Sequence, residues 1–361
     1  MVKVDHKKYG EFCRKALEAA GLSKEAAEST EKFLLQTDMF GIRTHGTLNI
    51  LPYIRKIEAG GIVKDAKPEV VKEGPSWAVI DGHNGMGYYN ADYAMKIGME
   101  KAKQTGLSYV VIRNSSHYGA CGVYSVEGAK EGFITITATN VGKTMTVPGG
   151  RGRIIGNAPF SYGVPQGDRH PSVFLDVATS NAAGMKVNRA KTAGQKVPDG
   201  WIVDENGKPT NDPNTKWALY PLGGHKGYGM AFFIEVLSSI IGGGNILDTP
   251  MWDKDAATVC PYSQFFIFID TNQLMPMPEF KGRMDYAVEE IANSPKAEGS
   301  DHIYLPGEIE WGKYDKAMAE GLELPDDIER NARELAKMFD LDFDSCVVKT
   351  EEEEHLRRAA G

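Results

Sequence analysis

The sequence contains only four cysteines, and their spacing excludes two common ways of stabilising a small domain. Cys13, Cys121, Cys260 and Cys346 stand far apart, with no Cys-x-x-Cys pair and no histidine at metal-ligand spacing. Neither a disulfide framework nor a structural zinc site fits such a pattern. The sequence therefore predicts free thiols and no metal site, as in proteins of a reducing compartment.

Long apolar runs are also missing. The longest candidate, residues 230–241, is about half the length that crosses a bilayer and contains Glu235. The first residues, MVKVDHKKYGEF, are polar and contain no apolar core of a signal peptide. We therefore predict a cytoplasmic protein with no membrane partner.

A strongly basic surface is absent as well. The formal net charge is −8, and no stripe of basic residues interleaved with aromatics occurs. Nucleic acid binding depends on such a surface, so no nucleic acid partner is predicted. A small anionic substrate remains compatible with this charge, because a few local cations can focus an anion into a cleft.

Neither of the common glycine-rich nucleotide fingerprints is complete. Residues 85–90 (GMGYYN) nearly match G-x-G-x-x-G, but Asn90 replaces the last glycine and the next predicted strand ends in Arg113. The GKT at 142–144 resembles the end of a P-loop, yet Thr137 occupies the place of the required first glycine. The sequence thus predicts neither a Rossmann site nor a P-loop.

What the sequence does contain is an alternation of helical and strand patterns over 361 residues, enough for two or three packed units. Apolar spacing predicts two helices within 7–40, with Ser23 capping the second, and another helix at 47–59. The further predicted elements are strands at 77–81, 109–113, 133–140, 173–179 and 265–270; helices capped by Asn90 and running to Gln104, at 122–130, at 223–244, at 278–292 and from Pro325; and a hairpin at 200–210 with Asn206-Gly207 in its turn. The apolar and aromatic residues of 228–241 are predicted to be core.

The predicted fold class is α/β (α+β), with a helical unit formed by both ends of the chain and an α/β region between them. The tail from Glu351 is predicted to be a solvated face or a frayed end.

One histidine follows a predicted strand directly. The segment 114–122 (NSSHYGACG) places His117 between small residues at the end of the strand 109–113. The carboxyl ends of strands are where α/β sheets bind ligands. A neutral histidine can accept a hydroxyl proton and return it, so His117 is a candidate acid/base residue. A buried, hydrogen-bonded histidine is the alternative.

Three further segments carry polar groups at positions that suit a ligand, each with a structural alternative. Residues 43–46 (RTHG) stand at a helix entrance, where a capping threonine and a structural histidine would look the same. Asp176 ends a strand, where it could hold a ribose hydroxyl or be merely solvated. Lys226 lies among glycines at a helix N-terminus, which is unfavourable for a cation unless an anion binds there.

Taken together, these motifs over residues 10–330 resemble the malate/L-lactate dehydrogenase type 2 family, which includes ureidoglycolate, sulfolactate and diketogulonate enzymes and a cyclic-imine reductase. The matching pieces are RTHG (43–46), NSSHYGA (114–120), TVPGG (146–150), LDVATS (175–180), a GW-hairpin with NGKPTNDP, and PLGGHKGYG (221–229). The resemblance implies a family-specific non-Rossmann nucleotide-binding fold, hydride transfer to or from a nicotinamide, and a homodimer.

The resemblance also implies site residues. His117 matches the proton acceptor, and His45 with Thr44 matches a second catalytic histidine. The implied contacts to NAD, with NADP as the alternative, are Gly119, Ala120, Asn140, Asp176, Val177, Ala178, Lys226, Pro306, Gly307 and Glu308. It is on this basis that we predict a helical unit of 1–75 and 310–361, a nucleotide-binding unit of 76–125 and 223–309, and a β-rich unit of 126–222.

Two departures from the family pattern lie on the substrate side. Relatives usually carry an arginine three residues after the glycine of the SHG motif, where this chain has Asn49, and G-[ST]-N-P, where this chain reads 156–159 (GNAP). Asparagine cannot grip a carboxylate as an arginine fork does. We therefore expect an unusual substrate, held by Asn49 and Asn157 and anchored through another cation, such as Arg43 or Lys143.

The function predicted from the sequence is the interconversion of a small 2-hydroxy acid and its 2-oxo acid. Two alternatives remain at this stage: an NADPH-dependent cyclic imine reductase on the same scaffold, and a catalytically idle nucleotide-binding relative.

Overall fold

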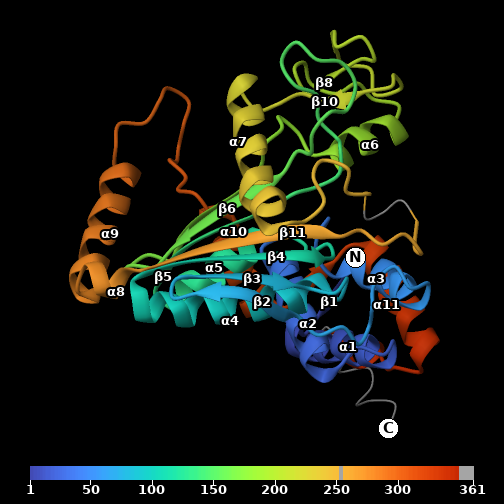
Figure 1. Cartoon of the computed structure of the whole chain (residues 1–361), viewed down its shortest axis with the longest axis horizontal. Helices are drawn as coiled ribbons and strands as arrows, with labels where there is room; N and C mark the ends of the chain where they lie inside the picture. Colours follow the sequence, from blue (N-terminus) through green and yellow to red (C-terminus); the bar gives the residue numbers. More distant parts are fainter. Residues whose placement is uncertain (252–254, 349–361) are drawn as a thin grey trace, which may run out of the picture.

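A computed structural model describes residues 1–251 and 255–348 (Figure 1). The predicted frayed tail from Glu351 lies outside the described residues. The centre of the molecule is a seven-stranded sheet with the order β2-β3-β4-β11-β5-β6-β7. Its strands are β2 (Glu69–Gly74), β3 (Trp77–Asp81), β4 (Leu107–Ser115), β11 (Tyr262–Asp270), β5 (Phe133–Thr139), β6 (Pro159–Val164) and β7 (Val173–Ala178).

The direction of these strands confirms the prediction of a mixed, non-Rossmann fold. Within this sheet β3 and β4 run parallel, and all the other neighbouring pairs are antiparallel. A Rossmann domain requires a mostly parallel sheet with crossover helices. The incomplete G-x-G-x-x-G fingerprint therefore belongs to a different architecture.

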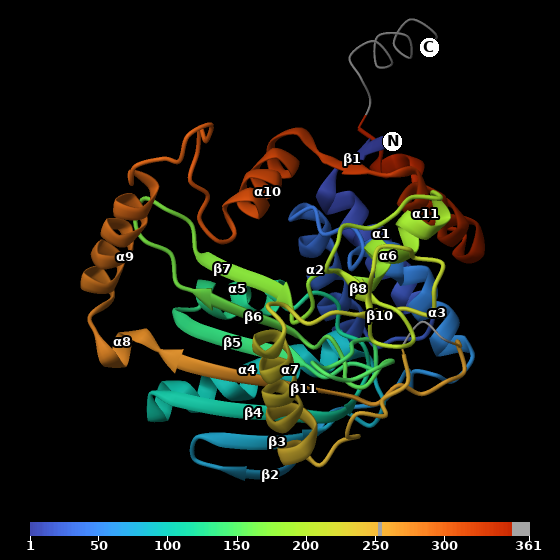
Figure 2. The same cartoon turned by 90° about the horizontal axis from the view of Figure 1, so that it is seen from above.

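Two helices, α4 (Gly87–Thr105) and α5 (Gly122–Lys130), cover one face of the sheet (Figure 2). Gly98 lets α4 approach closely, since a Cβ there would lie 2.4 Å from the ring of Phe268. The prediction that Asn90 caps this helix is wrong. The helix begins at Gly87, and the Asn90 amide donates instead to Gly82 O and Ser115 Oγ, tying the helix to the end of β4.

The opposite face carries α7 (His225–Glu235), which continues into a π-helical turn, η2 (Val236–Ile240). The η2 turn packs on β4 and β11, while the N-terminal part of α7 rises away from the sheet (Figures 1 and 2). Phe232 and Phe233 are 52% and 60% exposed, so the prediction that 228–241 is core fails for these residues in the single chain. Beside α7 lie a small sheet and a helix: β10 (Ala218–Leu219), β8 (Ile202–Val203), β9 (Pro209–Thr210) and α6 (Gly184–Thr192).

Both ends of the chain meet in one helical unit, which confirms that prediction. The strand β1 (Val2–Val4) pairs with β12 (Leu322–Leu324), and α1 packs on α11. The helices of this unit are α1 (His6–Ala19), α2 (Lys24–Met39), η1 (Thr47–Asn49), α3 (Ile50–Glu58), α10 (Glu308–Glu320), α11 (Asp326–Phe339) and η3 (Asp344–Cys346). Ser23 caps α2 as predicted, accepting a hydrogen bond from Ala26 N.

The division of the chain into three units stays a prediction. The seven-stranded sheet crosses its boundary at residue 126, because β5, β6 and β7 continue the sheet that β3 and β4 begin. The remaining helices, α8 (Thr271–Leu274) and α9 (Met277–Ala292), follow β11 at the end of the sheet farthest from the helical unit (Figure 2). The opposite end of the sheet, where β4, β5 and β7 finish, faces the helical unit.

Candidate active site

His117 lies in the loop that joins the end of β4 to the start of α5. Ser116 holds this loop on both sides, since its hydroxyl accepts from Gly87 N at 2.8 Å and its carbonyl accepts from Gln264 Nε2 at 3.0 Å. Gly119 follows with a positive φ of 80°, and a Cβ at that position would lie 2.3 Å from the Tyr88 hydroxyl. The glycine therefore permits both the turn and the close packing that place the histidine.

The structure brings His117 together with the second predicted histidine. The rings of His45 and His117 are stacked with their centroids 5.8 Å apart, although 72 residues separate them in the sequence (117 − 45). Tyr53, which the sequence analysis did not single out, lies on α3 with its hydroxyl 2.6 Å from His117 Nδ1. Its signal was helical spacing alone, since it follows Asn49 by one turn on the helix that the RTHG segment enters.

Burial keeps both imidazoles neutral. The rings are only partly exposed, and burial together with the neighbouring His45 lowers the pKa of His117 to about 3. Burial also lowers the pKa of His45 below its ordinary value. An imidazole that is neutral at physiological pH can accept a proton, so the pair provides a base at the end of the sheet.

A set of hydrogen bonds fixes the loop that carries His45. The Thr44 hydroxyl lies 2.9 Å from His45 Nδ1. Asn49, which is 5% exposed, donates its amide hydrogens to Thr44 O at 3.0 Å and to Gly46 O at 3.3 Å. The buried Asp38 accepts from Thr47 N at 2.9 Å and from the Thr47 hydroxyl. The amide nitrogen of Asn49 thus supports the loop, although we expected this amide to bind the substrate.

Two cations that the sequence analysis considered for the substrate are paired with carboxylates. Arg43 Nη1 lies 3.9 Å from Asp38 Oδ1, and Lys143 forms an ion pair with Asp248. Burial raises the pKa of Asp38 to about 6, although its bonds to Thr47 and the charge of Arg43 oppose the rise. Arg43 therefore balances the negative charge of the buried Asp38, and Lys143 balances that of the exposed Asp248.

Strand β7 gathers most of the predicted cofactor residues. Asp176 Oδ2 accepts from Gly122 N at 2.7 Å, next to the loop of Gly119 and Ala120. Phe174 N donates to Pro306 O at 3.3 Å, which brings the 306–308 turn to the same strand. Just beyond β7, Thr179 O accepts from Leu222 N at 2.9 Å, and this contact docks the turn that carries Lys226. Strand β7 itself carries residues 176–178, and it is linked by hydrogen bonds to the segments that carry 119–120, 226 and 306–308.

The chemistry of these residues fits a nicotinamide dinucleotide. Burial raises the pKa of Asp176 to about 6, and its carboxylate suits a sugar hydroxyl. The Thr179 hydroxyl is buried without a hydrogen-bond partner in the described part of the chain. Lys226 is exposed in the first turn of α7, where an anionic phosphate would be favourable for both the lysine and the helix end.

Three predicted contact residues have side chains that are already engaged. Asn140 is fully buried, accepting from Ser263 N and donating to Thr249 Oγ1 and Asn245 O. Asn157 binds the hydroxyls of Thr144 and Ser180. Glu308 binds His302 and Leu305 N, which shapes its own turn. These side chains therefore build the walls of the site, and their backbone remains the part that could face a ligand.

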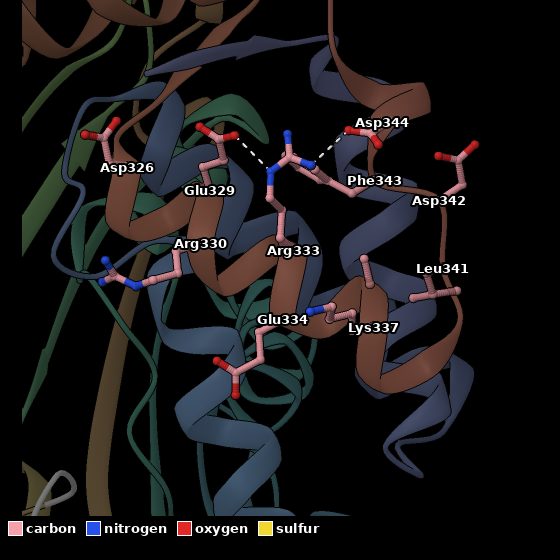
Figure 3. A pocket seen from close by; sticks show the side chains of 11 residues that line it. Asp326, Glu329, Arg330, Arg333, Glu334, Lys337, Leu341, Asp342, Phe343 and Asp344 are labelled. Atoms are coloured by element: carbon pink, nitrogen blue, oxygen red, sulfur yellow. Dashed lines mark hydrogen bonds and ion pairs between the residues drawn. The ribbon is translucent and has the colours of Figure 1, made fainter.

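Two hollows lie in different parts of the molecule. A small cavity of about 10 Å³ lies beside His117, lined by Tyr53, Lys56, Gly61, Ile62, Ser116, His117 and Cys260. A much larger open groove of about 730 Å³ lies against α11 (Figure 3). Charged side chains line that groove, and Arg333 binds Glu329 and Asp344 within it, so it offers no acid/base group comparable to the histidine pair.

Among residues 1–251 and 255–348, no group of three or more His, Cys, Asp or Glu side chains is arranged to hold a metal ion. In the same residues, none of the helices is both long enough and apolar enough to cross a membrane.

Comparison with known proteins places this chain in a family. The family model described as malate/L-lactate dehydrogenase matches residues 4–331. The malate dehydrogenase of Pyrococcus horikoshii is 31% identical over 93% of this chain and 95% of its own. The L-sulfolactate dehydrogenase of Methanocaldococcus jannaschii is 33% identical over 92% and 95%. The ureidoglycolate dehydrogenase (NAD(+)) of Escherichia coli K12 is 30% identical over 91% and 94%.

Solved structures agree with these matches. The structure of sulfolactate dehydrogenase from Methanocaldococcus jannaschii superposes with a TM-score of 0.88 at 32% identity, covering 96% of this chain and 99% of that one. A delta1-piperideine-2-carboxylate reductase from Pseudomonas syringae shares the fold with a TM-score of 0.83 at 24% identity, covering 93% and 100%. The mixed sheet of this chain is therefore the fold of a family of dehydrogenases. The chain belongs to the malate/L-lactate dehydrogenase family and is an oxidoreductase.

Proposed function

We propose that this protein interconverts a small 2-hydroxy acid and its 2-oxo acid, with His117 as the acid/base residue. The observation that carries the proposal is the cluster of His117, His45 and Tyr53 at the end of the sheet. This cluster lies near the residues of β7 that were predicted to contact the cofactor. In a member of a dehydrogenase family, this arrangement supplies a proton acceptor next to a nucleotide site.

The proton is handled by His117 and its neighbours. In the oxidising direction the neutral ring would accept the hydroxyl proton at Nε2, which requires the tautomer in which Nδ1 carries the ring proton and donates to the Tyr53 hydroxyl 2.6 Å away. His45, held by Thr44, stacks with the His117 ring at a centroid distance of 5.8 Å and would orient the acid. The bound nicotinamide supplies the hydride acceptor. In the reducing direction His117 returns its proton to the carbonyl oxygen.

NAD is the proposed cofactor, with NADP as the alternative. Asp176 would hold a ribose hydroxyl, and Lys226 a phosphate. Val177, Ala178, Gly119, Ala120 and the turn Pro306–Glu308 would form the surrounding wall together with the backbone of Asn140. The name of the Escherichia coli relative, which specifies NAD(+), supports this choice. A carboxylate at the ribose also favours NAD, because it would repel the extra phosphate of NADP.

A homodimer is part of the proposal. Phe232, Phe233 and Ile241 are 52%, 60% and 59% exposed on α7 and just after it, beside a sheet face that the single chain covers only in part. Apolar side chains exposed in such a group are typical of a surface that another chain covers. Because this face carries the helix of Lys226, we propose that a second copy completes the cofactor side of the site.

The proposed compartment is the cytoplasm. All four cysteines lie in the described part of the chain, and each is buried and forms no disulfide bond. Free thiols are typical of proteins that work under reducing conditions. Substrates are therefore expected to be small intracellular acids, and neither a membrane nor a nucleic acid is proposed as a partner.

The experiment is a nicotinamide absorbance assay of the purified protein. NAD⁺ and NADP⁺ are offered with malate, lactate, sulfolactate and ureidoglycolate, and the reduced cofactors with the 2-oxo acids and with a cyclic imino acid. Turnover with a hydroxy or oxo acid supports the proposal. Turnover restricted to the imine would establish the reductase alternative, and cofactor binding without any turnover would indicate an idle relative.

A further inference from the structure

Lys56 occupies the same face of the α3 segment as Asn49 and Tyr53. The intervals of four and three residues place these side chains in one row along the helix. Tyr53 in the middle of the row contacts His117. Lys56 lines the small cavity that Tyr53, Ser116 and His117 also line. This face of the α3 segment therefore lies next to His117, and Lys56 is the positively charged residue among the three.

Lys56 is buried to an extent that is unusual for a lysine. Its exposed fraction is 5%, and its ammonium donates to Asp255 O at 2.9 Å and to Thr258 O at 3.0 Å. Its third donor has the Cys260 thiol at 3.9 Å, a distant and weak acceptor. No carboxylate in the described residues forms an ion pair with it. A buried cation with neutral partners is costly, and an arriving anion would relieve that cost.

The two other cations that were considered for the substrate do not offer the same opportunity. Arg43 faces the buried Asp38, and Lys143 faces Asp248, so each already has a carboxylate. Asn49, at the place of the family's arginine, carries no charge and donates its amide to two backbone carbonyls. Lys56 is thus the cation beside His117 that still lacks an anionic partner in the described chain.

We infer that Lys56 binds the carboxylate of the substrate and supplies the charge that Asn49 lacks. This inference rests on the proposed function, because it names the anchor of the same acid. The third N–H of the ammonium is the group that turns to the carboxylate, while the two backbone carbonyls hold the lysine in place. The carboxylate would then lie beside the small cavity that Lys56, Tyr53 and His117 line.

The test compares Lys56→Gln and Lys56→Arg with the unmodified protein, using the best acid from the panel. Glutamine keeps two N–H donors for the carbonyls of 255 and 258 but removes the charge. We expect Lys56→Gln to raise the KM for the 2-oxo acid at least tenfold, with kcat changed less than threefold. Lys56→Arg is expected to recover most of the affinity. Lys64→Gln, a change at an exposed lysine nearby, serves as the matched control.

Direct binding provides a readout that is independent of turnover. Calorimetry with reduced cofactor present measures the affinity for oxamate, a 2-oxo acid isostere, and for its uncharged amide, oxamide. If Lys56 binds the carboxylate, Lys56→Gln should lower the affinity for oxamate at least tenfold. The affinities for oxamide and for the cofactor should not change. Equal loss for both compounds, or no loss for oxamate, would overturn the inference by showing a purely structural lysine. If the unmodified protein turns over no acid at all, the proposed function fails instead.

Discussion

The Tyr53 hydroxyl lies 2.6 Å from His117 Nδ1, and this contact joins the helical unit to the loop at the end of β4. Tyr53 is itself fully buried and lies 3.3 Å from the Tyr88 hydroxyl, so its position is set by packing on both sides. The contact holds the histidine ring at its Nδ1 atom. The proton acceptor of the site is therefore positioned by a residue from a different part of the chain.

Replacing Tyr53 with phenylalanine should lower kcat about tenfold, because a single hydrogen bond that orients the base is lost while the ring remains. Affinity for the cofactor should stay within twofold, measured by fluorescence titration. Tyr286→Phe, at a residue that is 64% exposed on α9, is the control. Equal kcat values for Tyr53→Phe and the unmodified enzyme would show that the contact has no catalytic importance.

The low pKa of His117 predicts an unusual pH profile for oxidation. Burial and His45 lower this pKa to about 3, so the ring stays unprotonated, and able to accept, well below the ordinary histidine value of ~6.5. We expect kcat/KM for the hydroxy acid to change less than threefold between pH 8 and about pH 5. The reduction consumes a proton, so its rate should rise as the pH falls. A loss of oxidation with a midpoint near 6.5 would contradict a buried base.

Asp176→Asn should stabilise the cofactor-free protein and weaken cofactor binding. Burial raises the pKa of this carboxyl from 3.8 to about 6, so the folded state binds its proton more tightly than the unfolded state does. The contribution of Asp176 to the free energy of unfolding is fully present below about pH 4, where the carboxyl is protonated, and is lost as the pH rises to about 6. The variant should therefore match the original at pH 4 and exceed it by up to about 3 kcal/mol at pH 7.

Denaturant unfolding at both pH values measures that difference, and the affinity for NADH is measured in parallel. Asp301→Asn, at an exposed site, is the control for a general charge effect. If the stability difference were the same at pH 4 and pH 7, Asp176 would not be a buried acid. If NADH affinity were unchanged, the residue would have no place in the cofactor site.

A charge on the exposed apolar face of α7 should break the proposed dimer. Phe233→Glu introduces a carboxylate at a side chain that is 60% exposed in the single chain. We expect light scattering to give twice the chain mass for the original protein and a lower mass for the variant, with unchanged circular dichroism. Leu274→Glu, at a side chain 74% exposed on α8, is the control. A monomeric original protein would refute the dimer.

Asn49→Arg should shift the substrate spectrum toward that of ordinary relatives. An arginine fork at this position grips a carboxylate, which asparagine cannot do. The ratio of kcat/KM values for malate and for the best acid of the original protein should rise at least tenfold. An unaltered spectrum would mean that residue 49 does not select the substrate, as its bonds to Thr44 and Gly46 alone would suggest.

Local pattern was sufficient for much of the fold. The strand at 77–81 and the helix at 122–130 were predicted residue for residue, because their apolar patterns and boundaries are local. Strand β6 was missed since Pro159 and Gly163 are typical of turns, and its extended form is imposed by pairing with β5 and β7. The exposed face of α7 was predicted to be core because an apolar sequence pattern alone does not distinguish buried from exposed apolar side chains.

Local motifs also identified only part of the candidate site. The histidines were found because motifs carry them, but the partners that set their chemistry come from far along the chain. Asp38 beneath the His45 loop and Lys56 at the cavity have no motif, and their importance depends on burial. Conversely, Asn140 was predicted to touch the nucleotide, yet its amide binds Ser263 and Thr249 on distant segments.

The most direct test is the single-turnover rate of His117→Ala with the acid that the original enzyme uses best, at saturating cofactor. The account predicts a rate at least a hundredfold below that of the original, while the dissociation constant for the nicotinamide cofactor stays within twofold. An undiminished hydride transfer rate in this variant would contradict the assignment of the proton to His117, and with it the proposed mechanism.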